Sequence, residues 1–375
     1  MSMEEIEIGI GKRARIGYEL RELSVIPSRR TRDIDDVDVS WQLEGYNFTF
    51  PIIASPMDSL VSPQSAVHYG ELGGLAVLDL EGLWARHENA DELLDRMSSM
   101  TTEQVNESLR GLYSVPVKKE LMAELIKKVV DEGQVACGSV SPKNVASLAP
   151  AAAEAGLDIL LIHGLVVSAE HICSSPDPLD LGRFVRELDI PVLIGGCASY
   201  QNALHLMRTG ASGVLVGVGA GSSSRSKDFL GLGVPQATAI ADVVGARTRH
   251  LEETGFYVQV IADGGMTTAG DMVKAIACGA DAVMVGLPLA KAKEAPAKNW
   301  YFGSSFHHEY SPRGILLETK SDLPMREILF GPVKRNAGDT NLVGAMKRAM
   351  ATCGAQTLKE LQKTELVVGR QYNGK

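Results

Sequence analysis

The stretch VQVIADGGMTTAGDMVKAIACGADAVMVGL (258–287) decides the fold. It starts with the apolar run VQVIADGG (258–265), continues through the amphipathic segment TTAGDMVKAIACGA (267–280) and ends in the apolar run AVMVGL (282–287). Apolar runs without alternation indicate strands that are buried on both faces, and a helix between two such strands makes them parallel. A Gly-Ala pair typical of a helix C-terminus precedes the second run. The stretch therefore predicts a strand–helix–strand unit of a parallel sheet.

The same pattern recurs along the chain. Eight short apolar runs are each followed by glycine, serine or aspartate: PIIAS (51–55), GLAVLD (74–79), QVACGS (134–139), DILLIHG (158–164), PVLIGG (191–196), GVLVGVG (213–219), VQVIADGG (258–265) and AVMVGL (282–287). Eight parallel strands with intervening helices are typical of a closed (β/α)8 TIM barrel, and a doubly wound sheet is the alternative. We expect residues 1–375 to form a single barrel domain.

Two long segments interrupt this alternation of predicted strands and helices. Residues 80–133, after the second strand, contain ENADELLDRMSSMTTEQVNESLRGLYS and KKELMAELIKKVVDEG, which predict a helical excursion. Residues 288–340, after the eighth strand, include the aromatic stretch NWYFGSSFHHEYSPRG. Long segments next to the active face of a barrel commonly contact the substrate. We interpret 288–340 as a lid-like or flap-like insertion.

Composition excludes several classes of protein. The chain has 375 residues, a net charge of −9 and a pI near 5.5, which argues against broad nucleic-acid binding. No apolar run approaches the roughly 18 residues of a membrane helix, and the N-terminus lacks the apolar region of a signal peptide. The five scattered cysteines form no metal-binding motif. We expect a cytoplasmic protein with reduced thiols, without membrane or nucleic-acid partners.

Polar groups follow the last two predicted strands. Gly264 and Gly265 directly precede a helix start, where free N–H groups and the helix dipole favour an anion. Gly286 ends the neighbouring strand, and paired glycines after strands seven and eight bind phosphate in many barrels. Asp263 has the acceptors for a vicinal diol such as ribose. These positions predict a site for a phosphorylated ligand. A sugar-phosphate isomerase or a flavin oxidase would have a site of this kind, so these positions alone do not distinguish between such classes.

Longer motifs distinguish between the classes of phosphate-binding barrel. ASPMDSLVS (54–62), GVGAGSSSRSKDFLGLGVPQATA (217–239) and IADGGMTTAGDMVKAIACGADAVMVG (261–286) resemble the IMP dehydrogenase and GMP reductase family. The chain is most similar to the bacterial "IMP dehydrogenase-related" subfamily without a CBS module, whose VVSAEH and SPRG features appear at 166–171 and 311–314. The absence of a CBS module is consistent with 80–133, which is too short to contain one. The resemblance implies IMP or GMP as ligand, NAD or NADP as cofactor, a role in purine metabolism and GMP biosynthesis, and a homotetramer. It disfavours the other phosphate-binding barrels.

The resemblance also assigns roles to individual residues. The phosphate would contact Ser222, Gly265 and Gly286 beside Gly264, and Asp263 would bind the ribose. Ser55 and Met57 would flank the ribose and purine, and Gly303 and Ser304 would meet the base. A potassium ion would be held by loop carbonyls. These carbonyls would come from Gly219, Gly221 and Ser224.

One position departs from the family at the reacting centre. In the family a cysteine thiolate attacks purine C2, and here Ser224 occupies that place with Ser226 beside it. A serine hydroxyl ionises far above a thiol and needs a general base in contact. His163, where the family has aspartate, lies on the correct face for a base. Two interpretations stay open: an NAD(P)-linked purine-nucleotide oxidoreductase, or a redox-inactive nucleotide-binding protein with a regulatory role.

Further differences surround Ser224. Arg225 stands where the family has threonine, Gly196 where asparagine is usual, and Leu287 where serine follows the phosphate glycine. Cys197, after the fifth strand, is the one thiol near the active face, and we expect it to be packed in the core.

Overall fold

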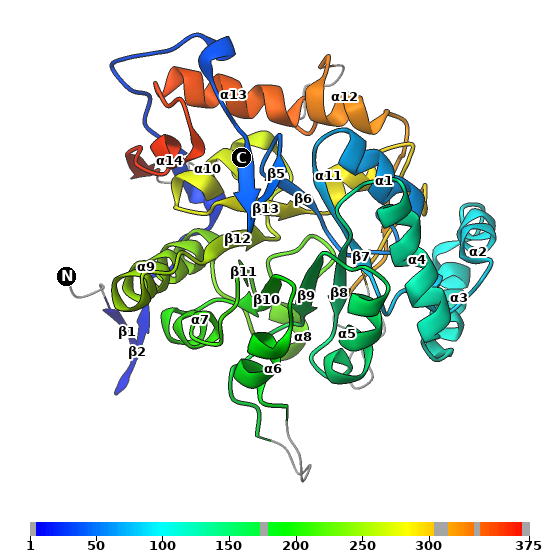
Figure 1. Ribbon diagram of the computed structural model, residues 1–375. Helices are drawn as coiled ribbons and strands as arrows, with labels where there is room; N and C mark the ends of the chain where they lie inside the picture. The colour runs from blue at the N-terminus through cyan, green and yellow to red at the C-terminus, as the bar shows by residue number, and fades with distance from the viewer. Residues whose placement is uncertain (1–4, 173–178, 304–313, 334–337, 370–375) are drawn as a thin grey trace.

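The structure is a computed structural model that describes residues 5–172, 179–303, 314–333 and 338–369 (Figure 1). Eight parallel strands close into a barrel in the order β10-β11-β12-β13-β6-β7-β8-β9. The strands are β6 (Ile52–Ala54), β7 (Leu75–Asp79), β8 (Cys137–Val140), β9 (Ile159–His163), β10 (Val192–Cys197), β11 (Gly213–Val216), β12 (Gln259–Asp263) and β13 (Ala282–Val285). Each coincides with one of the eight predicted runs, so the (β/α)8 prediction is confirmed.

Helices surround the barrel, as Figure 1 shows. Apart from the helical excursion between β7 and β8, those between consecutive strands are α1 (Pro63–Glu71), α5 (Val145–Glu154), α6 (Leu181–Glu187), α7 (Tyr200–Met207), α8 (Ser226–Leu230), α9 (Gln236–Thr254) and α10 (Ala269–Ala277). After the last barrel strand come α11 (Leu287–Ala290), α12 (Met325–Phe330), α13 (Leu342–Thr352) and α14 (Leu358–Leu361). No helix in the described part of the chain is long and apolar enough to cross a bilayer.

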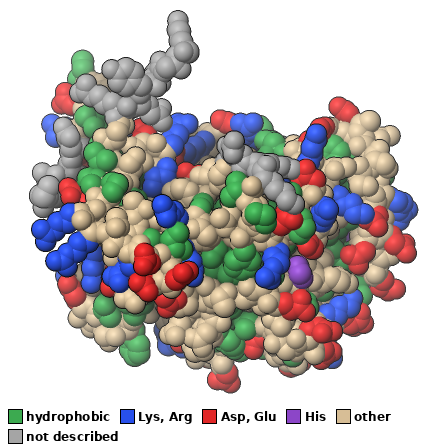
Figure 2. All heavy atoms as spheres, turned by 90° about the horizontal axis from the view of Figure 1, so that it is seen from above, with side chains coloured by type: hydrophobic (Ala, Val, Ile, Leu, Met, Phe, Trp, Pro, Cys, Tyr) green, Lys and Arg blue, Asp and Glu red, His purple; other side chains and the backbone are tan. Residues whose placement is uncertain are grey.

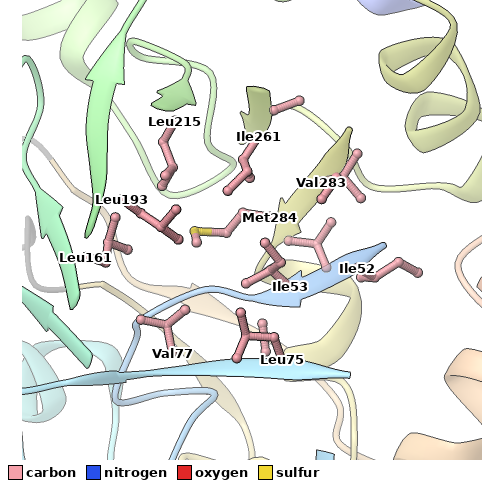
Figure 3. Close-up of a cluster of buried hydrophobic side chains, with 14 of the residues drawn as sticks. Ile52, Ile53, Leu75, Val77, Leu161, Leu193, Leu215, Ile261, Val283 and Met284 are labelled. Carbon is pink, nitrogen blue, oxygen red and sulfur yellow. The ribbon is translucent and has the colours of Figure 1, made fainter. Parts of the chain in front are cut away.

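Apolar side chains fill the barrel interior. Val77, Leu161, Leu193 and Leu215 come from four different strands and point toward one another in Figure 3. Met284 lies among them and also lines the cavity above. Cys197 is fully buried, its Sγ donating to the Leu215 carbonyl, as expected for a packed thiol. The interior is thus a packed floor beneath the active face.

The helical excursion contains one more break than the sequence indicates. It forms α2 (Ala90–Met97), α3 (Thr102–Ser114) and α4 (Lys119–Asp131). The predicted first helix divides because Thr101 and Gln104 form a capping box that starts α3. Helices α2 and α3 share a small separate core with the insertion after β13, which includes Trp300 and Phe302.

Short elements complete the fold. The strand pairs are β1 (Glu5–Gly9) with β2 (Lys12–Arg15), β3 (Leu23–Val25) with β16 (Leu366–Val368), β4 (Trp41–Leu43) with β5 (Tyr46–Phe48), and β14 (Trp300–Tyr301) with β15 (Leu317–Glu318). Among the described residues, 3₁₀ turns lie at Leu20–Glu22, Ile34–Asp36 and Leu83–Ala85. Acidic and basic side chains are interspersed over the face seen in Figure 2.

Candidate functional site

A cavity of about 840 Å³ opens at the carboxyl ends of the barrel strands. This is the face on which (β/α)8 enzymes place their active sites. The volume lies near the upper end of the range for small-molecule sites, which leaves room for more than one ligand group. Three parts of its wall matter below: the glycine cradle (Gly264, Gly265 and Gly286), the glycine loop (217–226) and the β7 wall (Asp79, Glu81, Arg86 and Tyr113).

Close backbone contacts shape the glycine cradle. Gly264 and Gly265 have φ values of +83° and +79°, in the left-handed region that favours glycine. A Cβ on Gly264 would lie 2.8 Å from the Gly221 nitrogen, so the cradle touches the glycine loop directly. Gln236 fixes this contact, because its Nε2 donates to the carbonyls of Val216 (2.7 Å) and Asp263 (3.2 Å). The ends of β11 and β12 are thereby held together.

Tyr301 closes the other end of the cradle. A Cβ on Gly286 would lie 2.3 Å from the Tyr301 hydroxyl and 3.1 Å from the Met57 sulfur. The hydroxyl also reaches the Ser223 side chain and the Leu287 backbone, and burial raises the pKa of Tyr301. A neutral phenol therefore stands beside the cradle, where it can donate to an anionic oxygen.

The tip of the glycine loop carries three consecutive serines. The Ser224 hydroxyl donates to Ser226 Oγ (3.2 Å) and accepts from the Ser226 N–H (3.4 Å). The insertion after β13 returns to this tip, since the Ile315 N–H donates to the Ser223 carbonyl (2.8 Å) and Ser224 forms a β-bridge with Gly314. The loop tip is therefore held by contacts from a distant part of the chain.

His163 and Asp263 meet across the barrel opening. His163 ends β9 and Asp263 ends β12, three strands apart in the closed order. The His163 Nε2 lies 3.3 Å from Asp263 Oδ2, and both side chains are partly exposed to the cavity. Of the hydrogen bonds in the described residues, none joins His163 to Ser224.

Carboxyl groups gather at the β7 wall. Asp58, only 1% exposed, accepts bonds from the Tyr113 hydroxyl and the Leu83 N–H. Burial raises the pKa of Asp58 to about 6, against the lowering effect of those bonds. Asp79 lines the cavity beside it, and Tyr113 reaches the wall from α3. The helical excursion thus contributes directly to the cavity.

The predicted site residues come together in this cavity. Thirteen of them line it: Ser55, Met57, His163, Gly219, Gly221, Ser222, Ser224, Ser226, Asp263, Gly264, Gly265, Gly286 and Gly303. Ser304 lies outside the described residues. The sequence reasoning missed Asp79, Tyr113 and Gln236. Asp79 ends a barrel strand and could have been found by that signal, whereas Tyr113 and Gln236 lie on helices with no local signal.

Comparisons with known proteins agree with this geometry. The family model described as "IMP dehydrogenase / GMP reductase domain" matches residues 17–322. An "uncharacterized oxidoreductase" of Mycobacterium tuberculosis (strain ATCC 25618 / H37Rv) is 44% identical over 373 residues, covering 97% of this chain and 100% of that protein. The inosine-5'-monophosphate dehydrogenase of Thermoplasma acidophilum is 30% identical over 257 residues, covering 65% of this chain and 51% of that enzyme.

A solved structure matches nearly the whole molecule. The crystal structure of an "IMP dehydrogenase/GMP reductase-like protein" from Corynebacterium glutamicum superposes with a TM-score of 0.92 at 42% identity, covering 97% of this chain and 98% of that one. The match extends beyond the barrel to the excursion and the terminal elements. The chain therefore belongs to the IMP dehydrogenase / GMP reductase family of oxidoreductases.

Proposed function

We propose that the protein binds a purine nucleoside 5'-monophosphate, IMP or GMP, and performs NAD- or NADP-linked redox chemistry at purine C2. One observation carries this proposal: a single cavity unites the glycine cradle, Asp263 and the tip of the glycine loop. An oxidoreductase of this family needs an anion site, a diol acceptor and a group facing the base within one nucleotide length.

Different residues would contact the phosphate, the ribose and the purine of this nucleotide. Backbone N–H groups of Gly265 and Gly286, with the Ser222 hydroxyl, suit the phosphate at the N-terminal end of α10. Asp263 accepts from the ribose hydroxyls, with Ser55 nearby on the cavity wall. The purine then lies between Met57 and Ser224, and Gly303 borders its edge.

The rest of the cavity fits a nicotinamide. Beyond Asp263 the wall mixes polar side chains with apolar ones, namely Ser139, Ser141 and His163 with Leu165 and Val166. This mixture suits an aromatic ring that carries polar substituents. A bound nicotinamide supplies or accepts the hydride exchanged with purine C2. The protein residues orient the purine, and the lining side chains exclude water from the reacting face.

A second function is favoured by Ser224 itself. Its hydrogen-bond partner is another serine, and a hydroxyl is too weak a base to activate it. A protein with this loop tip could bind the nucleotide, serve a regulatory role and perform no turnover.

Ligand binding and turnover separate the two functions. IMP and GMP should each raise the melting temperature, and inosine should not, because it lacks the phosphate. Absorbance of the nicotinamide, followed with IMP plus NAD and with GMP plus NADPH, reports turnover. Ser224→Cys should increase any turnover by orders of magnitude, since a thiolate is a far stronger nucleophile. Absence of a shift with either nucleotide at millimolar concentration would contradict both functions.

Potassium and assembly form part of the same proposal. The carbonyls of Gly219, Gly221 and Ser224 belong to one loop, which turns back through a 2.9 Å bond from the Ser224 N–H to the Gly221 carbonyl. Such carbonyls suit a potassium ion, and replacing potassium by sodium should lower turnover. We also infer a homotetramer acting in the cytoplasm.

A further inference from the structure

Asp79 occupies the side of the cavity opposite the glycine loop. It ends β7, which is four strands from β11 in the closed order of eight. The nucleotide proposed above uses the ends of β11, β12, β13 and β6. Asp79 therefore faces the space left for a second ligand.

The Asp79 carboxyl keeps bonding capacity toward the cavity. Its Oδ1 accepts one bond, from the Glu81 N–H (3.0 Å). Within the described part of the chain, no hydrogen bond is recorded for its Oδ2. The two acidic neighbours of Asp79 already accept other hydrogen bonds. Asp58 accepts from the Tyr113 hydroxyl and the Leu83 N–H. Glu81 accepts from the Ser141 N–H and the Asn144 side chain.

No ion pair is recorded for this carboxyl among the described residues. Arg86 is the basic side chain of the β7 wall, and its N–H groups donate to the backbone carbonyls of Glu81, Tyr113 and Val115. Burial first, and then the charges of Asp58 and Glu81, hold the pKa of Asp79 well above its usual range, against a smaller lowering effect of Arg86. The carboxyl thus retains its proton at pH values where an exposed aspartate has lost it.

A neutral carboxyl group is recognised best by a ligand group that has both a hydrogen-bond donor and an acceptor. Its O–H donates while its other oxygen accepts, so it pairs through two bonds with a group that has a C=O beside an N–H. With Oδ1 already accepting from Glu81, the proton belongs on Oδ2, and Oδ1 keeps a second lone pair. A carboxamide matches this arrangement, whereas a carboxylate or phosphate offers only acceptors.

We propose that Asp79 is a specificity residue that binds the carboxamide of the nicotinamide ring through paired hydrogen bonds. This inference rests on the proposed function, which requires that ring in the same cavity. Asp79 orients the ring from the side opposite the purine and takes no part in bond making.

Binding of two dinucleotides tests the proposal without turnover. Titration calorimetry compares NAD with its 3-acetylpyridine analogue, whose ketone keeps the C=O and lacks the N–H. The wild type should bind NAD about tenfold more tightly or better, because the analogue supplies no N–H to the second lone pair of Asp79 Oδ1. Asp79→Asn, which keeps a donor and an acceptor, should retain this preference. Asp79→Leu, which has neither, should bring the ratio near one.

Two controls separate local loss from misfolding. Asp91→Leu makes the same exchange on the exposed first turn of α2 and should keep the wild-type ratio. IMP affinity should be unchanged in every variant, because the glycine cradle lies across the cavity.

Each contrary result has a distinct meaning. If Asp79→Asn loses the preference as Asp79→Leu does, a charged carboxylate is required and the inference is wrong. The inference also fails if the wild type binds both dinucleotides equally, although the proposed function then stands. If Asp79→Leu instead alters discrimination between IMP and purine riboside monophosphate, Asp79 contacts the purine edge and the inference is again wrong. A wild type that binds IMP and neither dinucleotide overturns both the inference and the redox function.

Discussion

Gly264 shows at the scale of one residue how the cradle depends on close backbone contact. We predict that Gly264→Ala lowers IMP affinity about tenfold, because its Cβ would press on the Gly221 nitrogen at 2.8 Å. Gly255→Ala is the matched control: its φ is +77°, and a Cβ there meets nothing within 4 Å. Both variants should lose about 1–2 kcal/mol of stability from the left-handed backbone. Calorimetric binding and thermal unfolding measure the two effects, and equal IMP affinities would refute the contact argument.

A second prediction at this scale concerns pH. The folded-state pKa of Asp79 lies above the usual aspartate value of 3.8, mainly through burial. As pH rises, the unfolded chain loses this proton first, so stability falls above about pH 4. The amide introduced by Asp79→Asn does not titrate, and this variant should therefore gain melting temperature relative to wild type as the pH rises above about 4. A difference in melting temperature that does not change with pH would contradict the raised pKa of Asp79.

The candidate site residues that lie at the ends of barrel strands could be predicted from the sequence. Asp263, Gly265 and Gly286 follow apolar runs, and parallel strands bring their carboxyl ends to one face. Tyr113 and Gln236 could not be found this way, because their roles depend on contacts with Asp58 and Val216, far away in sequence. Side-chain bonding between distant segments leaves no local pattern.

At the scale of elements, the two interruptions of the barrel prove to be one unit. The sequence indicates a helical excursion and an insertion separately, since each is recognised by its own composition. Their joint core, which includes Leu109 of α3 and Phe302 of the insertion, is fixed only by tertiary packing. A 2.9 Å hydrogen bond from Trp300 Nε1 to the Met97 carbonyl also connects the insertion to α2. The Phe302 N–H in turn donates to Ser59 Oγ (3.1 Å), which connects this unit to the barrel.

This arrangement predicts local rather than global destabilisation. Leu109→Ala should destabilise α2 and α3 by about 2–5 kcal/mol, because Leu109 is fully buried in the small core. The barrel, which has a separate core, should keep its protection. Hydrogen exchange followed by mass spectrometry resolves the two regions, with the half-exposed Leu251→Ala on α9 as control. Uniform loss of protection across the barrel would show that the cores unfold together.

At the scale of the whole molecule, the N-terminal hairpin of β1 and β2 leaves its isoleucines uncovered. Ile6, Ile8 and Ile10 are 44%, 62% and 109% exposed, and the Arg15–Asp242 ion pair (2.6 Å) joins the hairpin to α9. A lone two-stranded hairpin is marginally stable in water, so an apolar face of this kind favours burial against another copy of the chain.

The homotetramer proposal can be tested at this hairpin. Wild-type protein should have four times the 40.1 kDa mass of the chain in sedimentation velocity, and Ile8→Asp should shift the population toward smaller species. Glu7→Asp, on the neighbouring position of the same strand, should leave the mass unchanged. A monomeric wild type, or an Ile8→Asp protein of unaltered mass, would remove the hairpin from the assembly.

The contact between His163 and Asp263 has a consequence for how the proposed nucleotide would arrive. A sugar that approaches Asp263 meets an oxygen whose partner is already in place, so its entry is an exchange of one hydrogen-bonding group for another. Under the proposed function the His163 imidazole would occupy the place of a ribose hydroxyl before binding and would regain it after release. Asp263 would then be turned toward the sugar before the proposed nucleotide arrives.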